Sequence, residues 1–162
     1  MKNLLLMRHA KSSWKDASLP DHQRPLNKRG KRDAPCMGEF LREQGITLDA
    51  ILCSTAARAK ATVEGFLQGY TFDGDLVYIN DLYHAGPETI LIRLMQLPDN
   101  VDSAMVIAHN PGLDDFLDVV CDAPEHMPTA SVAYIQFPIE RWAELHVVKR
   151  GELIHLWKPR EI

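Results

Sequence analysis

The sequence is poor in cysteine and has no long apolar stretch. Its three cysteines, Cys36, Cys53 and Cys121, are far apart and odd in number, and no Cys-x-x-Cys pair occurs. This pattern argues against a disulfide framework and against a zinc site. No stretch approaches the ~20 apolar residues that a membrane-spanning helix needs. The apolar run at residues 4–7 is shorter than the roughly 7–15 residues of a signal-peptide core. We therefore expect a cytoplasmic protein without membrane association.

Glycine-rich phosphate loops are also absent. Neither a Walker sequence nor Gly-x-Gly-x-x-Gly is present, so no local motif supports nucleotide binding. No repeat, low-complexity tract or linker divides the 162 residues, of which 46% are apolar and 25% charged. This composition is typical of a globular protein, and we expect a single domain over residues 1–162.

Positive charge is concentrated near the N-terminus of an otherwise acidic chain. The formal net charge is −4, which argues against a nucleic-acid partner. Residues 1–32 contain nine basic and two acidic residues, which leaves nine basic and twenty acidic residues for the remainder. This asymmetry predicts that the first segment serves an anionic ligand. The four basic residues within 28–32 are interpreted differently, as a solvated face of a helix.

Strand and helix patterns alternate along most of the chain. Short apolar runs predict buried strands at 3–7 and 50–53, a third strand at 76–79, and a fourth, continuously apolar strand at 104–108. Amphipathic segments predict helices at 28–44, 56–68, 88–96 and 111–120, with a long loop at 8–26. Alternating segments predict antiparallel strands at 132–137, 145–148 and 153–157. The expected fold class is α/β, a three-layer α/β/α domain with a mostly parallel mixed sheet and an antiparallel C-terminal edge.

Reactive side chains follow three of the predicted strands. Arg8 and His9 end the first strand, Arg58 lies one turn into the helix after the second, and His109 follows the fourth. The carboxyl ends of parallel strands share one sheet edge, where ligands collect. Arginine offers paired donors to phosphate oxygens, and histidine can attack phosphorus or donate a proton. A lone histidine at a strand end is usually structural. Four such groups together indicate a site for a phosphoryl dianion, because crowded cations repel one another without an anion.

The order of these residues resembles the motifs of a known family. The matching segments are Met7-Arg8-His9-Ala10, Arg24-Pro25-Leu26-Asn27-x-x-Gly30, Ser54-x-x-x-Arg58-Ala59-x-x-Thr62 and Ala108-His109-Asn110. They resemble, in turn, the Arg-His-Gly signature, the Pro-Leu-Thr-x-x-Gly segment, the second phosphate arginine and the second histidine of the histidine phosphatase superfamily, the phosphoglycerate-mutase-like proteins. The short chain and the run from Arg8 to Trp14 resemble the SixA-type phosphohistidine phosphatases.

The resemblance implies a phosphoglycerate-mutase-like fold and a phosphatase that uses neither a metal nor another cofactor. It implies that His9 attacks phosphorus in line with the leaving group and forms a covalent phosphohistidine, which water then hydrolyses. Arg8, Arg58 and a protonated His109 would hold the equatorial oxygens, where charge must be met in the transition state.

The implied substrate is phosphohistidine on a signalling or phosphotransfer protein, so the expected partner is that phosphorylated protein. Ser12, as a hydroxyl donor, and Arg24, at the rim, are further substrate-binding candidates, with loop packing as the alternative for both. A small-molecule phosphomonoesterase is the alternative among enzymes. A phosphoprotein-binding module that kept the pocket and lost turnover is the alternative outside them. The chain has no obvious lid-forming insertion, which by analogy with the family suits a macromolecular substrate.

Two positions depart from the family pattern. Ala10 replaces the glycine that lets the backbone approach the ligand, and alanine is compatible there only with a negative φ. Many members carry a proton-donating glutamate in a Leu-x-Glu setting after the third strand. The matching residues here are Leu82-Tyr83-His84. His84 is therefore either a proton donor that contacts the substrate or a residue of a surface loop.

A cysteine mechanism is the remaining alternative. Cysteine phosphatases use Cys-x5-Arg, but only four residues separate Cys53 from Arg58, and none of them is glycine. We expect Cys53 to be a buried, apolar strand residue.

Overall fold

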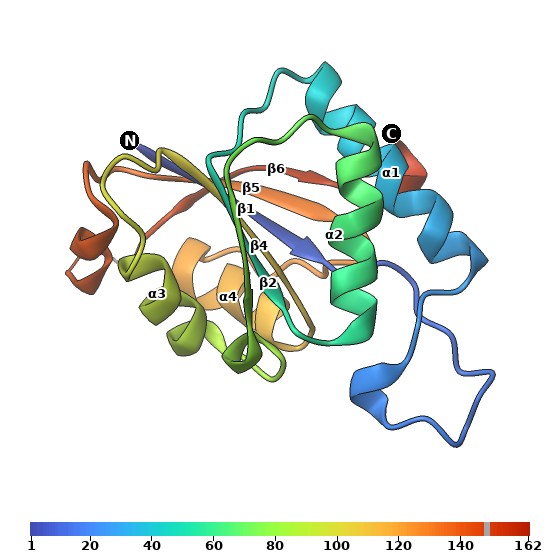
Figure 1. Cartoon of the computed structure of the whole chain (residues 1–162). Coiled ribbons are helices and arrows are strands. Elements are labelled where there is room, and N and C mark those ends of the chain that lie inside the picture. Colours follow the sequence, from blue (N-terminus) through green and yellow to red (C-terminus); the bar gives the residue numbers. More distant parts are fainter. Residues whose placement is uncertain (148–149) are drawn as a thin grey trace.

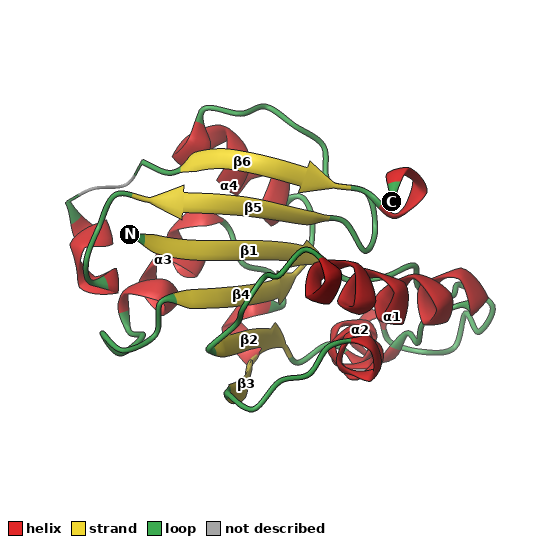
Figure 2. Ribbon diagram, turned by 90° about the horizontal axis from the view of Figure 1, so that it is seen from above, coloured by secondary structure: helices red, strands yellow, loops and turns green. Residues whose placement is uncertain are grey.

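A single mixed sheet forms the centre of the computed structural model, which describes residues 1–147 and 150–162. Its strands are β1 (Lys2–Arg8), β2 (Ala50–Ser54), β3 (Asp75–Ile79), β4 (Ser103–Ala108), β5 (Val132–Phe137) and β6 (Glu152–Trp157). The spatial order is β3-β2-β4-β1-β5-β6. β1 to β4 run parallel, whereas β5 is antiparallel to β1 and β6 to β5 (Figure 2). The predicted mixed sheet with an antiparallel C-terminal edge is confirmed.

Helices cover both faces of this sheet (Figure 1). They are α1 (Lys28–Glu43), α2 (Ala57–Gly69), α3 (Pro87–Met95) and α4 (Gly112–Cys121). Side chains alternate along β1, so that Leu5 and Met7 join the core beneath α1 and α2, whereas Leu4 and Leu6 join the core beneath α3 and α4. The three-layer α/β/α arrangement is confirmed. Among the described residues, no helix is both long and apolar enough to cross a membrane.

The apolar character of the central strands follows from this layering. Every residue of β2 and of β4 is buried, because parallel strands between two helical layers have no solvated face. β3 lies at the edge of the sheet and is exposed or half-buried along its length. The fully buried strands β2 and β4 therefore have their carboxyl ends in the middle of the sheet, where the candidate residues are.

The first turn of α1 fixes the loop that follows β1. The Asn27 side chain caps α1 by accepting a hydrogen bond from the amide of Gly30, at 2.9 Å. A Cβ on Gly30 would lie 2.2 Å from the carbonyl oxygen of Lys11, so only glycine allows this approach. The loop residues after the predicted nucleophile are thus packed directly against a capped helix end.

One strand prediction is wrong. Residues 142–146, which overlap the strand predicted at 145–148, form a short 3-10 helix, η3 (Trp142–His146). Trp142 and Leu145 are both buried, at the i, i+3 spacing of a helical turn, and the Trp142 indole donates to the carbonyl of Val101 at 2.7 Å. The Glu144 carboxylate accepts the amide of Arg141 at the start of η3. Val148 lies outside the described residues.

Candidate active site

The four predicted catalytic residues come together at the carboxyl edge of the parallel strands. Arg8 is the last residue of β1, His9 follows it, and His109 follows β4. Arg58 lies in the first turn of α2, just after β2, and its side chain is buried. The imidazole rings of His9 and His109 have centroids 5.1 Å apart. Sequence positions separated by up to a hundred residues therefore form one cluster, as the strand-end argument predicts.

The His9 ring is held in one tautomer. Its Nδ1 lies 2.8 Å from the carbonyl oxygen of Ala10, and a carbonyl can only accept, so Nδ1 carries the proton and Nε2 keeps its lone pair. Burial lowers the His9 pKa to about 4, with the nearby cations Arg58 and Arg8 adding to the effect. At neutral pH the ring is therefore uncharged and its Nε2 keeps a lone pair, as the predicted nucleophile requires.

The alanine at position 10 fits the backbone that the site requires. Among the described residues, the non-glycine residues with positive φ are Asp122 and Ala130, so Ala10 has the negative φ that the substitution demands. Its amide donates to the Thr62 hydroxyl at 2.8 Å, and that hydroxyl donates to the carbonyl of Arg58 at 2.7 Å. Thr62 thus joins the loop after His9 to the helix turn that presents Arg58.

His109 is neutral in the ligand-free protein, which refines the expected protonated form. Burial, together with the nearby His9 and Arg58, lowers its pKa to about 3. Its Nε2 lies 2.7 Å from the Ser54 hydroxyl, and its Nδ1 is buried without a partner. A phosphoryl dianion beside the ring would raise this pKa, because it favours the cation. The protonated His109 inferred from the sequence therefore requires the anion to be bound.

Buried nitrogens without a hydrogen-bond partner mark where an anion would bind. In the part of the chain that the structure describes, the buried side-chain nitrogens without a hydrogen-bond partner are Arg8 Nε, Arg58 Nε and His109 Nδ1. Burying such a group without a partner costs about 1–3 kcal/mol, and more when it is charged. All three belong to predicted catalytic residues. A phosphoryl group at His9 would supply oxygen acceptors to them.

Asp21 is a residue of this site that the sequence reasoning missed. It comes from η1 (Asp21–Gln23) in the loop between β1 and α1. Its carbonyl oxygen accepts Arg58 Nη1 at 2.7 Å, and its carboxylate accepts Arg58 Nη2 at 3.0 Å, Arg24 Nε at 3.0 Å and the Tyr83 hydroxyl. The hydrogen bonds from Tyr83, Arg24 and Arg58 hold the Asp21 pKa well below its usual range. The one sequence feature that could have indicated Asp21 is its position three residues before Arg24, a spacing that allows an ion pair between them.

Ser12 and Arg24 are bonded to each other. Arg24 Nη1 donates to the Ser12 hydroxyl at 2.6 Å, both residues are buried, and the Arg24 guanidinium lies 3.5 Å from the centre of the Trp14 ring. These contacts brace the loop after β1, which is the packing alternative raised for both residues. The Arg24 charge also lowers the His9 pKa, so Arg24 is close enough to act on the site electrostatically.

His84 lies in the loop that connects β3 to α3 and borders the site. It is exposed, and its ring is 4.0 Å from that of Tyr83, centre to centre. Together with Arg58, His109 and Asp21 it lines a pocket of about 340 Å³. It is near enough to His109 to contribute to the lowering of the His109 pKa. His84 is thus an exposed loop residue that also borders the site, and its role as a proton donor stays a prediction.

Cys53 is placed in the core. It is fully buried in β2 among the residues beneath α1 and α2, and burial raises the pKa of its thiol far above the ordinary value. A thiolate does not form under such conditions, and only the thiolate is nucleophilic. The arrangement thus disfavours the cysteine mechanism.

The fold and the strand-end cluster define a protein of the phosphoglycerate-mutase-like class. Residues 4–77 match the histidine phosphatase superfamily (branch 1). The uncharacterized protein At3g52155, chloroplastic, of Arabidopsis thaliana is 31% identical over 153 residues, which cover 88% of this chain and 70% of that protein. The chain belongs to the histidine phosphatase superfamily.

Other relatives refine this placement. The uncharacterized protein Rv1276c of Mycobacterium tuberculosis is 41% identical over 105 residues, or 65% of this chain, and the match spans only 63% of that protein's length. The solved structure described as a "Putative Phosphohistidine Phosphatase SixA" from Nakamurella multipartitia superposes with a TM-score of 0.84 at 27% identity, covering 98% of this chain and 96% of that one. Within the superfamily, the chain is similar to the SixA-type proteins.

Proposed function

We propose that this protein is a phosphohistidine phosphatase, which hydrolyses the phosphoryl group of phosphohistidine on a signalling or phosphotransfer protein. The observation that carries the proposal is the set of three unpartnered, buried nitrogens on Arg8, Arg58 and His109 around the neutral ring of His9. Donors fixed in place before the substrate arrives stabilise developing charge without reorganising. The SixA-like fold supports the same substrate class.

The reaction proceeds in two displacements. His9 Nε2 attacks phosphorus, the new N–P bond forms, and the P–N bond to the substrate histidine breaks. The electron pair of that bond goes to the departing imidazole nitrogen, which takes up a proton from solvent. Water then attacks the phosphoryl group on His9 and gives up a proton to solvent, the N–P bond breaks with its electron pair returning to Nε2, and phosphate leaves the neutral ring. Arg8, Arg58 and the anion-protonated His109 hold the equatorial oxygens in both steps.

The leaving group explains the missing glutamate. An alkyl ester must expel an alkoxide, and a positioned general acid is worth about 10²–10⁴ in rate for such a step. Imidazole titrates around pH 6.5, so it takes up a proton easily and leaves with little help. Two carboxylates, Asp21 and Asp115, line the pocket beside His84. Asp21 is ionised and bonded to Arg58 and Tyr83, so it has no proton to give. The site therefore suits a phosphoamide better than an ester.

A turnover comparison tests the proposal. We expect a phosphohistidine protein and phosphoramidate to react at least ~10²-fold more efficiently than an alkyl phosphate, the low end of the general-acid contribution. The His84→Glu variant should reduce this difference in efficiency, because the added carboxyl group should raise turnover of the alkyl phosphate. If His84 is a proton donor, His84→Ala should lower turnover of the alkyl phosphate but not of the phosphoamides. Chelators should have no effect, because no group of three possible metal ligands occurs among residues 1–147 and 150–162.

Equal efficiency on both substrate classes would leave a general phosphomonoesterase in place of the phosphohistidine phosphatase. A single burst of leaving group without further turnover would indicate a binding module. Inhibition by a chelator that a divalent metal reverses would contradict the metal-independent mechanism.

A further inference from the structure

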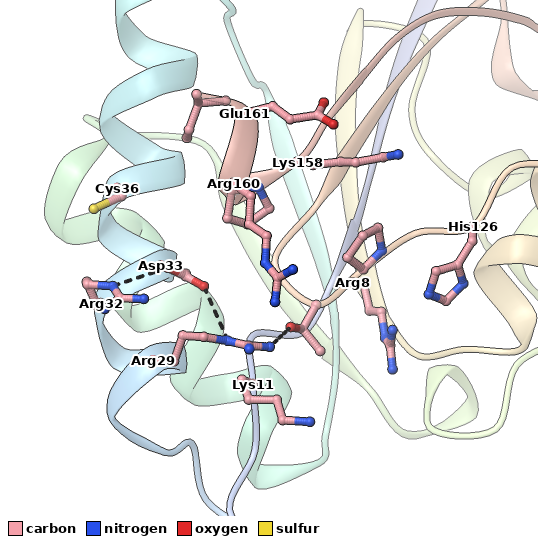
Figure 3. A pocket seen from close by; sticks show the side chains of 14 residues that line it. Arg8, Lys11, Arg29, Arg32, Asp33, Cys36, His126, Lys158, Arg160 and Glu161 are labelled. Carbon is pink, nitrogen blue, oxygen red and sulfur yellow. Dashed lines mark hydrogen bonds and ion pairs between the residues drawn. The ribbon is translucent and has the colours of Figure 1, made fainter.

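A second, larger pocket lies beside the cluster of Arg8, His9, Arg58 and His109, which we call the catalytic cluster. It is a groove of about 740 Å³ between the first half of α1 and the C-terminal segment that includes η4 (Pro159–Glu161) (Figure 3). Its cationic side chains come from three parts of the chain: Arg8, Lys11, Arg29, Arg32, Lys158 and Arg160. We call this feature the basic groove. Arg8 is one of its lining residues and directly precedes His9, so the groove adjoins the catalytic cluster.

Most of this charge is not neutralised locally. The acidic side chains that line the basic groove are Asp33 and Glu161. Asp33 is shared between Arg29, at 4.0 Å, and Arg32, at 3.5 Å. Within the described ranges 1–147 and 150–162, no ion pair involves Lys11, Lys158 or Arg160. On a chain with a net charge of −4, such a concentration of unpaired cations is a local feature that attracts anions.

Exposure indicates the kind of anion. The side chain of Arg58 in the catalytic cluster is 7% exposed, whereas those of Arg32 and Arg29 are 69% and 42% exposed. A subsite for one more phosphate needs donors that are buried and held in fixed geometry. Exposed, mobile cations spread along a groove instead complement a charged macromolecular surface, where they steer association and set orientation. The basic groove therefore fits an acidic protein face better than a second phosphate.

We infer that the basic groove docks an acidic face of the phosphoprotein substrate while its phosphohistidine reaches His9. This inference rests on the proposed function and adds to it the charge of the partner surface. The carrier protein of a phosphohistidine bound at His9 must lie over the neighbouring surface, and Arg8 joins that surface to the reacting group. The solvated helix face predicted for segment 28–32 thus includes two residues, Arg29 and Arg32, that line a docking surface.

Two peptides separate this docking from the chemistry. Each carries one phosphohistidine, flanked in one peptide by Asp and Glu and in the other by Ser and Gln. At low ionic strength the wild-type protein should have a kcat/KM about 10-fold higher for the acidic peptide, within the 10–10³-fold range of electrostatic steering. The preference should shrink as salt is added, because exposed charges are screened.

The matched variants change charge inside and outside the basic groove. Arg32→Glu with Arg160→Glu should bring the preference for the acidic peptide to within about 2-fold, since steering depends on these charges. Arg42→Glu with Arg150→Glu is the control: both side chains are exposed, Arg42 lies on the last turn of α1, and both pairs give a net charge of −8. The control should keep the preference. Phosphoramidate turnover should stay unchanged in both pairs.

Several outcomes would overturn the docking inference while leaving the proposed function intact. These are equal wild-type efficiency on the two peptides, an equal loss in the control pair, and stronger inhibition by an oligonucleotide than by the unphosphorylated acidic peptide at equal charge. If neither peptide is turned over, the proposed function fails instead. Fluorescence anisotropy of the unphosphorylated acidic peptide then decides the docking question: weaker binding to the Arg32/Arg160 variant alone supports it, and equal binding to all three proteins overturns it.

Discussion

The catalytic cluster and the basic groove hold positive charge in opposite ways. In the cluster, Arg58 is buried and fixed by two hydrogen bonds to Asp21. In the groove, Arg32 is 69% exposed and its neighbour Asp33 is shared with Arg29. The first arrangement costs desolvation and gives a defined direction to each donor. The second costs little and gives attraction without direction.

The catalytic cluster therefore depends on the exact positions of its donors, whereas the basic groove depends on its charge. A transition state is stabilised only by donors that are already in place, so the cluster depends on each atom of its side chains. A docking surface depends on the sum of its charges. Substitutions that keep charge but change shape should therefore damage the cluster and spare the groove.

The largest effect should come from the nucleophile. His9→Ala should lower turnover by on the order of 10³-fold or more, because no second nucleophile stands in the cluster. Acid-quenched wild-type protein should carry a phosphoamide label, and the variant should not. A label that persists in His9→Ala would contradict the proposed covalent intermediate.

Cys53→Ala is the control for that experiment. Cys53 lies in the core with a raised thiol pKa, so its loss should leave turnover within about 2-fold, although a small cavity lowers stability. A folded Cys53→Ala protein without activity would revive the thiolate mechanism.

Much of the fold could be predicted because the central strands of the sheet are parallel and covered on both sides. β2 and β4 are buried along their whole length, so each gives a continuous apolar run, and the reactive residues follow directly in sequence. The cluster of Arg8, His9 and His109 could then be placed at one edge without knowing any distance. The strand predicted at 145–148 failed because two buried residues three apart, Trp142 and Leu145, follow the period of a helical turn.

The parts that could not be predicted depend on loops. Asp21 reaches Arg58 because η1 folds back from the segment between β1 and α1, and no periodicity marks such a return. The basic groove joins α1 to Lys158 and Arg160 at the other end of the chain. The charge asymmetry of residues 1–32 indicated an anionic ligand, but not that the C-terminal segment completes the surface.

The comparison between cluster and groove is sharpest for a change from arginine to lysine. Arg58→Lys should lower turnover by about 10²-fold, since one ammonium group cannot reproduce parallel donors to phosphate and to Asp21 at once. Arg32→Lys keeps the groove's charge and should leave the preference for the acidic peptide within about 2-fold. Steady-state kinetics of both variants on phosphoramidate and on the two peptides measure this contrast. If the change to lysine reduced activity equally at Arg58 and Arg32, the cluster and the groove would not differ in their dependence on geometry.

The smallest effect concerns the acid limb of the pH dependence. Burial lowers the pKa of His9 to about 4, so between pH 6 and pH 5 its neutral fraction should fall by only about a tenth. A histidine with the ordinary pKa of about 6.5 would lose about eightfold over the same range. Nuclear magnetic resonance of the imidazole C–H signals, assigned with His9→Gln and His109→Gln, measures this directly. Titration of the His9 signal near pH 6.5 would contradict the buried, neutral nucleophile.

Burial of these histidines also predicts how a bound anion changes the His109 pKa and how the stability of the protein changes with pH. Burial lowers the pKa of His109 to about 3, and a bound oxyanion such as tungstate should raise it, because a nearby dianion favours the cation.

The unfolded chain binds protons below about pH 6.5 that the folded histidines do not. Stability should therefore decline as the pH falls from about 6.5 towards about 4, and tungstate should reduce that decline. Denaturant unfolding of the wild type and of His109→Gln at pH 7 and pH 5 measures it. A wild-type protein as stable at pH 5 as at pH 7, with no difference from the variant, would show that these rings are not held neutral by burial.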